Sequence, residues 1–312
     1  MTVLINPTIT APWKRQDFVF LYDVTNGNPN GDPDANNAPR SDPDTGIGLV
    51  TDVSIKRKVR DAVALLRGES DPYRIYVQTQ GIALNALHEE AHVNTYGEVI
   101  VEEQNGDGAE KPARARRTDP EEVHGRRTYM YKHFWDVRMF GAVMSTGDFP
   151  AGQVHGPMQI GFADSVDPVS ALDLAITRVA VTNLDPKRPD KRTEIGHKML
   201  LPYALYRGSG FFSPAWARLS GVSVEDLEVF WEAFQRMWDN HRSASSGMQS
   251  LWKIVVFSHD NPLGNAPTHQ LFGRIQVVRR EGVEFPRCRD DYTVTISGDD
   301  LPQGVTLTTI EC

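Results

Sequence analysis

Residues 17–24 have the sequence DFVFLYDV, in which large apolar side chains recur at every second position. Phe18, Phe20, Tyr22 and Val24 therefore fall on one face, the period-two pattern of a strand with a buried side. The segment is therefore predicted to be a strand.

Two helices are predicted, one in each half of the chain. Residues 53–66 carry apolar side chains at helical spacing, and Asp52 is the expected cap. Residues 223–238 form the clearest helix, because Ser223 precedes Asp226 by three positions and an aromatic stripe follows. A third helix is expected over residues 131–144. Further strands are expected over residues 74–80, 158–162, 174–181, 199–206, 251–257, 271–278 and 292–296.

This order of elements is typical of an α+β fold with helices on one face of an antiparallel sheet. The length of 312 residues and the hydrophobic content of 40% allow one core with insertions, or two domains. Neither a membrane-spanning run nor a secretory signal is recognised. The presence of only two cysteines, Cys288 and Cys312, argues against a disulfide framework, so we expect a reducing, cytoplasmic location.

The net charge of −8 argues by itself against a nucleic-acid-binding protein. Basic residues nevertheless cluster at 56–60, 114–127 and 187–192. A basic groove on an acidic body can still bind phosphate, because charges beyond about 8–10 Å are screened at physiological salt.

The polar segment that follows the first strand, residues 26–48, is rich in Asn, Asp, Gly and Pro and is expected to lack regular structure. A calcium loop does not fit, since a start at Asp32 or Asp42 places no Gly at position six and no Glu at position twelve. We interpret the segment as one whose Asn side chains and backbone amides bind phosphate or sugar. The alternatives are a solvated loop, or a metal-dependent nuclease using Asp32 or Asp34.

The start of the helix at residues 53–66 is a candidate phosphate clamp. Lys56 and Arg60 are four residues apart and share a face, and Ser54 lies in the first turn, where free amides favour an anion. Spacing alone supports an ordinary solvated basic face equally well. The basic projection at 187–192 and the small-residue loop at 242–247 are weaker signals of the same kind.

Catalytic motifs are not recognised: the sequence has no Walker-type phosphate loop, no HExxH, no CxxC and no GxSxG. The histidines are scattered. We assign no catalytic residue, metal ligand or cofactor.

Residues 20–33, FLYDVTNGNPNGDP, and 48–61, GLVTDVSIKRKVRD, resemble the backbone subunit of CRISPR surveillance (Cascade) complexes, most closely that of type I-C, in the RAMP superfamily. The shorter segments DVRMFG at 136–141, GPMQIG at 156–161 and GHKM at 196–199 extend the resemblance over roughly residues 15–275.

The resemblance implies one domain over residues 1–312: a modified RRM-like (ferredoxin-like) palm, a helical finger insertion at about 81–150 and a β-hairpin thumb at about 177–198. It implies a non-catalytic subunit that polymerises along the spacer of one CRISPR RNA and presents it to target DNA. The implied partners are CRISPR RNA, the target DNA strand, neighbouring copies, and the processing or cap, large and small subunits, with no membrane.

The site residues implied by the resemblance fall into two groups. The expected RNA contacts are Asn26, Asn28, Asn30, Ser54, Lys56, Arg57, Arg60, Lys187, Arg188, Arg192, His197, Lys198, Arg242 and Ser245. The expected DNA contacts, in the finger, are Arg114, Arg116 and Arg117.

Overall fold

The computed structural model of the chain describes residues 5–78, 81–97, 118–180 and 194–312. Its strands are β1 (Arg15–Gly27), β2 (Gly31–Asp32), β3 (Ala38–Pro39), β4 (Ile47–Val50), β5 (Gly141–Met144), β6 (Gly152–His155), β7 (Met158–Pro168), β8 (Leu172–Arg178), β9 (Glu194–Phe212), β10 (Met248–His259), β11 (Ile275–Arg279), β12 (Tyr292–Ile296) and β13 (Val305–Glu311). Its α-helices are α1 (Asp52–Arg67), α2 (Leu84–Tyr96), α3 (Pro120–His133), α4 (Trp135–Phe140), α5 (Pro214–Ser220), α6 (Val224–Asn240) and α7 (Thr268–Phe272).

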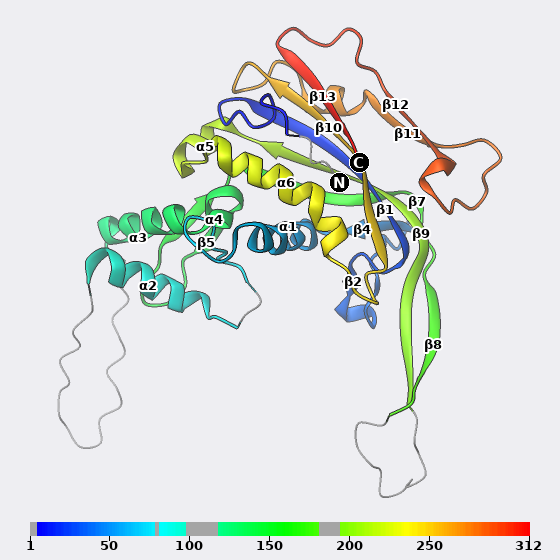
Figure 1. Cartoon of the computed structure of the whole chain (residues 1–312), viewed down its shortest axis with the longest axis horizontal. Coiled ribbons are helices and arrows are strands. Elements are labelled where there is room, and N and C mark those ends of the chain that lie inside the picture. The colour runs from blue at the N-terminus through cyan, green and yellow to red at the C-terminus, as the bar shows by residue number, and fades with distance from the viewer. Residues whose placement is uncertain (1–4, 79–80, 98–117, 181–193) are drawn as a thin grey trace, which may run out of the picture.

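The main sheet is antiparallel and, within the described residues, has seven strands. Six of them follow the order β13-β10-β1-β9-β7-β4, and β8 pairs with the outer part of β9. The strand predicted from the alternating pattern is present as β1, and it lies inside the sheet between β10 and β9. Figure 1 shows α1 and α6 along one face of this sheet and the β11–β12 hairpin on the other side. The mixed α+β architecture with an antiparallel sheet is therefore confirmed.

The core forms where the apolar face of β1 meets α6. Phe18, Phe20, Tyr22 and Val24 are fully buried in one cluster. The Phe20 ring meets the Phe234 ring of α6 edge-on, with centroids 5.0 Å apart. Burying an aromatic side chain of this size contributes about 1.5–3 kcal/mol relative to leaving it exposed, so the shared aromatic layer fixes α6 on the sheet.

Two glycines of β9 make room for these rings. Gly208 lies directly opposite Phe20, and Gly210 opposite Phe18. A Cβ at Gly208 would lie 2.1 Å from the Phe20 ring, so only glycine lets the ring cross the strand there.

The two predicted helices on this face are present with small differences. Helix α6 begins with the expected Ser223 cap, whose hydroxyl accepts a hydrogen bond from the Asp226 amide in a capping box. Helix α1 is capped by Thr51, which accepts from the Ser54 amide, and not by Asp52. Asp52 is instead the first helical residue, where a carboxylate is stabilised by the positive helix end.

A second lobe contains α2, α3, α4 and the β5–β6 hairpin, with its own buried cluster that includes Tyr76, Leu87, Met130 and Phe134. The strand expected at 74–80 is wrong for its described part, because residues 74–78 form no strand. Arg74 makes only an isolated bridge with Phe134, and the backbone amides of Tyr76 and Val77 donate to the Asp136 carboxylate rather than to a strand.

The helix expected over residues 131–144 is also wrong, because the chain divides there into the end of α3, the short helix α4 and strand β5. Phe134 adopts an extended conformation between the two helices, where it pairs with Arg74. A contact with a distant part of the chain thus overrides the local helical pattern.

The far face of the sheet is covered by α7 and the β11–β12 hairpin, which bury Val19, Leu21, Phe257, Leu271 and Tyr292. The strand expected over 271–278 begins later, at Ile275, because Leu271 belongs to α7. Strand β13, which pairs with β10, was not predicted.

The β8–β9 hairpin projects away from the body of the protein (Figure 1). Its described pairs run from Leu172 with Leu200 to Arg178 with Glu194. The strand expected at 174–181 corresponds to β8, which ends at Arg178. The strand expected at 199–206 lies within β9, which extends well beyond that range at both ends and pairs with β1 from Leu201 onward. No helix in the described ranges is long and apolar enough to cross a membrane.

Candidate functional site

Three segments far apart in sequence meet where the hairpin joins the sheet. The backbone amide of Asn28 donates to the Ser245 carbonyl at 2.8 Å, which ties the end of β1 to the loop after α6. The ammonium group of Lys198, on β9, donates to the Ala244 carbonyl in the same loop. Gly27 approaches so closely that a Cβ there would lie 2.1 Å from the Ser246 carbonyl oxygen. We call residues 241–247 the junction loop.

The asparagines after β1 have different surroundings. Asn26 is exposed and has a positive φ of 49°, so its side chain lies at the surface beside the junction loop. Asn28 is buried, and its amide donates to the Asn37 carbonyl at 2.6 Å. The carbonyl oxygen of the Asn30 side chain accepts from the amide and the hydroxyl of Thr51, at 2.9 and 3.0 Å. Asn28 and Asn30 therefore position the segment and the start of α1, and of these side chains only that of Asn26 is exposed.

The sequence predicted that residues 26–48 lack regular structure, but the structure contains a short pair of strands there. β2 pairs with β3, and the Asn37 amide donates to the Asp32 carbonyl at 2.7 Å. This small hairpin keeps the polar segment folded against the start of α1.

The predicted clamp of Lys56 and Arg60 does not face open solvent. The two side chains do share a face of α1, but both lie over the Phe140 ring, at 5.9 and 5.2 Å from its centroid. Arg60 is buried and paired with Asp136 at 2.7 Å, and Lys56 pairs with Asp52 at 3.1 Å. Arg60 is therefore neither part of an open phosphate clamp nor part of a solvated basic face. It forms a buried ion pair instead.

Another face of α1 points toward the junction loop and carries Lys58, which the sequence prediction did not select as a site residue. Its ammonium group donates to the Ser54 hydroxyl at 3.1 Å, and the residue is only 3% exposed. Burial lowers the pKa of Lys58 to about 8, against the opposing effect of Asp61. The spacing of four residues between Ser54 and Lys58 is a signal that could have identified this pair.

His241, at the start of the junction loop, belongs to the same basic group. Burial lowers the pKa of His241 first, the charges of Lys58 and Arg57 lower it further, and Asp61 opposes them. Arg57 itself pairs with Asp61 at 2.9 Å. Lys58, Arg57 and His241 thus lie close enough to influence one another, and the field they share favours an anion nearby.

Replacing Lys58 with methionine is expected to stabilise the protein by about 1–3 kcal/mol near neutral pH, because the variant no longer buries an ammonium group. The pKa of Lys58 is about 8 in the fold and 10.5 as its ordinary value. Between these values the unfolded chain holds a proton that the folded chain has released, so wild-type stability should rise with pH across this window. The difference between the two proteins should therefore shrink from pH about 8 upward, as measured by denaturant unfolding at a series of pH values. A constant difference would contradict the buried charge.

The remaining described site residues lie around the junction. His197, on β9, is exposed and pairs across the hairpin with Asp173 at 3.0 Å. Arg242 is exposed and pairs with Asp239 at 2.8 Å, within its own segment. Ser245 is exposed, with its carbonyl bonded to Asn28. The structure thus brings Asn26, Ser54, Lys198, Arg242 and Ser245 to one region.

Two groups of predicted contacts lie outside the described residues. They are Lys187, Arg188 and Arg192 at the expected thumb, and Arg114, Arg116 and Arg117 in the expected finger.

Asp32 and Asp34, the candidate catalytic residues of the nuclease alternative, take part in contacts within the segment of residues 26–48. The Asp32 carboxylate pairs with Arg40 at 3.3 Å and accepts from the Asp34 amide at 3.1 Å. In the described part of the chain, no group of three or more His, Cys, Asp or Glu side chains is arranged to hold a metal ion.

Comparison with known proteins gives a family match over most of the chain. The family model described as CRISPR-associated protein Cas7 matches residues 14–297. A curated relative, CRISPR-associated protein Cas7 of Haloferax volcanii, is 46% identical over 68 residues, which are 22% of this chain and 18% of that protein. The match therefore spans less than one fifth of the relative's length.

Solved structures match the chain at low sequence identity. A chain of a CRISPR RNA-guided surveillance complex in a pre-nicking state has a TM-score of 0.49 and 14% identity, with 78% of each chain covered. A chain of another CRISPR RNA-guided surveillance complex has a TM-score of 0.42 and 16% identity, covering 81% of this chain and 73% of that one.

Proposed function

The chain belongs to the CRISPR-associated protein Cas7 family, and from this premise we propose that it is a backbone subunit of a CRISPR surveillance complex. In this role it polymerises along the spacer of one CRISPR RNA and presents the bases for pairing with target DNA. The observation that carries the RNA-binding part is the basic group that three distant segments form at the junction loop.

The parts of the fold suit this role. We propose that the main sheet with α1 and α6 is a modified RRM-like palm, that the lobe of α2, α3 and α4 is the finger, and that the β8–β9 hairpin is the thumb, with type I-C as the subtype. The lobe has its own buried cluster, and the hairpin projects from the edge of the junction, so both can contact nucleic acid beyond the palm.

The chemistry of the junction fits a single-stranded backbone of any sequence. Lys198 and Arg242 supply cations from two sides, Asn26 and Ser245 supply small polar groups, and Lys58 adds a charge that a phosphate would stabilise. Such contacts recognise the phosphate backbone and its shape rather than the base sequence, and base pairing by the guide RNA selects the target. The overall charge of −8 does not oppose this, because the positive charge is needed only along the groove.

We propose no catalytic role for the chain. Asp32 is held by Arg40, and its carboxylate also accepts the Asp34 amide, so the pair serves the geometry of the segment. The proposed partners are CRISPR RNA, the target DNA strand, further copies of this chain and the other subunits of the complex, in the cytoplasm.

The test is co-expression with a CRISPR array and companion subunits, followed by purification and measurement of bound RNA. Wild-type protein should carry one RNA of defined length. Lys198→Glu combined with Arg242→Glu should reduce RNA retention, and the dependence of log affinity on log salt should become shallower by about 0.7 for each phosphate that the variant no longer neutralises.

The matched control is Lys14→Glu with Arg67→Glu, which changes the net charge equally at positions outside both the junction loop and the lobe of α2, α3 and α4. This control should bind RNA as the wild type does. Wild-type protein free of nucleic acid would overturn the proposed function, and equal reductions of RNA retention in both variants would overturn the assigned groove.

A further inference from the structure

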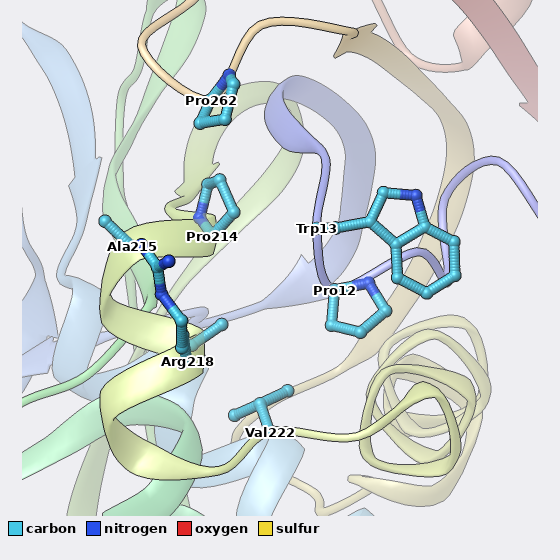
Figure 2. Close-up of a pocket in the computed structure, with 8 residues that line it drawn as sticks. Pro12, Trp13, Pro214, Ala215, Arg218, Val222 and Pro262 are labelled. Carbon is cyan, nitrogen blue, oxygen red and sulfur yellow. The ribbon is translucent and has the colours of Figure 1, made fainter.

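An apolar pocket opens at the end of the palm where β1 begins. It has a volume of about 330 Å³ and is lined by Pro12 and Trp13 before β1, by Pro214 and Arg218 of α5, and by Val222 and Pro262. Figure 2 shows Pro12 and the Trp13 ring on one side of this space, with Pro262 and α5, which carries Pro214, on the other. We call it the Trp13 pocket.

Large apolar side chains are exposed at the Trp13 pocket and next to its lining residues in sequence. Trp13 is 64% exposed, and Leu219, which follows Arg218, and Leu263, which follows Pro262, are 67% and 84% exposed. Exposed large apolar side chains beside a pocket are typical of protein interfaces, and Trp and Arg are among the residues that most often carry the binding energy there. The pocket is therefore suited to receive an apolar side chain from another protein molecule.

The same chain presents a suitable side chain elsewhere. Phe285 lies in the loop between β11 and β12, is 69% exposed, and stands between Glu284 and Pro286. The loop is held in shape: Arg279 donates to the Glu284 carbonyl at 3.0 Å, and the Asp291 carboxylate accepts from the amides of Arg287 and Cys288. A loop fixed in this way loses little entropy when it binds. We call residues 280–288 the Phe285 loop.

The Trp13 pocket and the Phe285 loop lie at opposite ends of the palm. The pocket is at the start of β1, whereas the β11–β12 hairpin is anchored near its other end, where Arg289 meets Asp23 at 3.4 Å. The ten residues between Trp13 and Asp23 span roughly 30 Å in a strand. In Figure 1, α5 lies at the left of the palm and the loop between β11 and β12 at the right. The two surfaces therefore do not meet within one chain.

We propose that the Phe285 loop of one copy inserts into the Trp13 pocket of the next copy, so that the backbone assembles head to tail. Contact between two different surfaces of identical chains leaves one of each unused at the ends, which gives an open filament rather than a closed pair. This inference rests on the proposed function and deepens it by naming the contact between copies.

Charge complementarity supports this occupant. Arg218 is exposed at the pocket, and Glu284 precedes Phe285 in the loop. Within the described residues, neither the guanidinium of Arg218 nor the carboxylate of Glu284 has an ion-pair partner. Insertion of Phe285 brings an unpaired carboxylate to the side of the pocket where an unpaired guanidinium lies. Apolar contact with the prolines and Trp13 gives affinity, and the charge pair gives orientation.

The experiment compares Trp13→Glu and Phe285→Glu, each alone and mixed in equal amounts, on a single-stranded RNA that is several binding sites long. Native mass spectrometry counts the copies on each RNA. Wild type should load in contiguous runs, and each variant alone should lose cooperativity by roughly tenfold or more. The mixture retains one intact pocket and one intact loop, so it should form pairs but no longer runs.

A charge exchange provides an independent test. Arg218→Glu and Glu284→Arg should each weaken cooperative loading, and the two together in one chain should restore it, because every contact then carries the reversed pair. Val278→Glu, at an exposed position of β11 outside the loop, is the matched control and should behave as wild type.

Outcomes separate the inference from the proposed function. All variants should bind an RNA of one site length with wild-type affinity and keep the wild-type melting temperature. Wild-type cooperativity in Trp13→Glu or Phe285→Glu, or a mixture that forms no pairs, would overturn the head-to-tail contact while leaving RNA binding intact. Failure of the wild type to bind RNA at all would overturn the proposed function instead.

Discussion

Replacing Arg60 with alanine is expected to destabilise the protein by about 3–5 kcal/mol, because it leaves a buried carboxylate without its cation. The Arg60 guanidinium lies 2.7 Å from the Asp136 carboxylate, and both side chains are buried. Asp136 also accepts the amides of Tyr76 and Val77, at 2.7 and 3.1 Å. The pair therefore joins α1, which covers the main sheet, to α4 and the second lobe. Chemical denaturation of the purified variant measures the loss of stability.

Lys56→Ala is the matched control for Arg60→Ala. Lys56 lies one turn away on the same face of α1 and also lies near the Phe140 ring, but its partner Asp52 is partly exposed. A surface ion pair of this kind contributes about 1 kcal/mol or less. Equal destabilisation of the two variants, or an Arg60→Ala protein as stable as wild type, would show that the Arg60–Asp136 pair does not support the fold.

This result would also decide how RNA-binding experiments on α1 are interpreted. A combined Lys56→Ala and Arg60→Ala protein that fails to retain RNA could have lost the fold rather than a phosphate contact. Variants of Lys198 and Arg242 avoid this ambiguity, because both residues lie at the surface of the junction.

Asp226→Ala is expected to have the second large effect, again about 3–5 kcal/mol, because one carboxylate serves two structural roles. Its oxygens accept two hydrogen bonds from the buried Arg138 guanidinium, at 2.7 and 3.0 Å. One oxygen also accepts the Ser223 amide at 2.9 Å and completes the capping box of α6. Removal of the carboxylate leaves Arg138 buried without a counter-charge and the first turn of α6 without its cap.

Asp226→Asn separates these two roles. The amide oxygen can still accept the Ser223 amide, so the cap contribution of about 0.5–2 kcal/mol should be retained, while the charge pair with Arg138 is removed. Denaturant unfolding should therefore rank wild type above Asp226→Asn, and Asp226→Asn above Asp226→Ala. Hydrogen exchange should speed up at the first turn of α6 only in the alanine variant. Equal stability of the two variants would show that the capping box contributes nothing measurable.

The sequence alone was sufficient for elements whose evidence is local. The alternation at residues 17–24 predicted the strand β1, and Ser223 with Asp226 predicted the start of α6. The motifs around residues 20–33 and 48–61 indicated the family. Each of these signals depends on side chains a few positions apart, and the strand and helix periods make such neighbours predictable.

The tertiary structure alone decided which polar groups are available. Spacing correctly put Lys56 and Arg60 on one face of α1, but the partner of Arg60 lies 76 positions later in the sequence. Phe134 also has a partner that is distant in sequence, Arg74, and their pairing interrupts the predicted helix. Lys58 likewise has a neighbour, His241, from the opposite half of the chain. Local periodicity says which face a side chain occupies. Packing between distant segments determines what that face meets, and burial and ion pairing then determine whether a charge can still bind a phosphate.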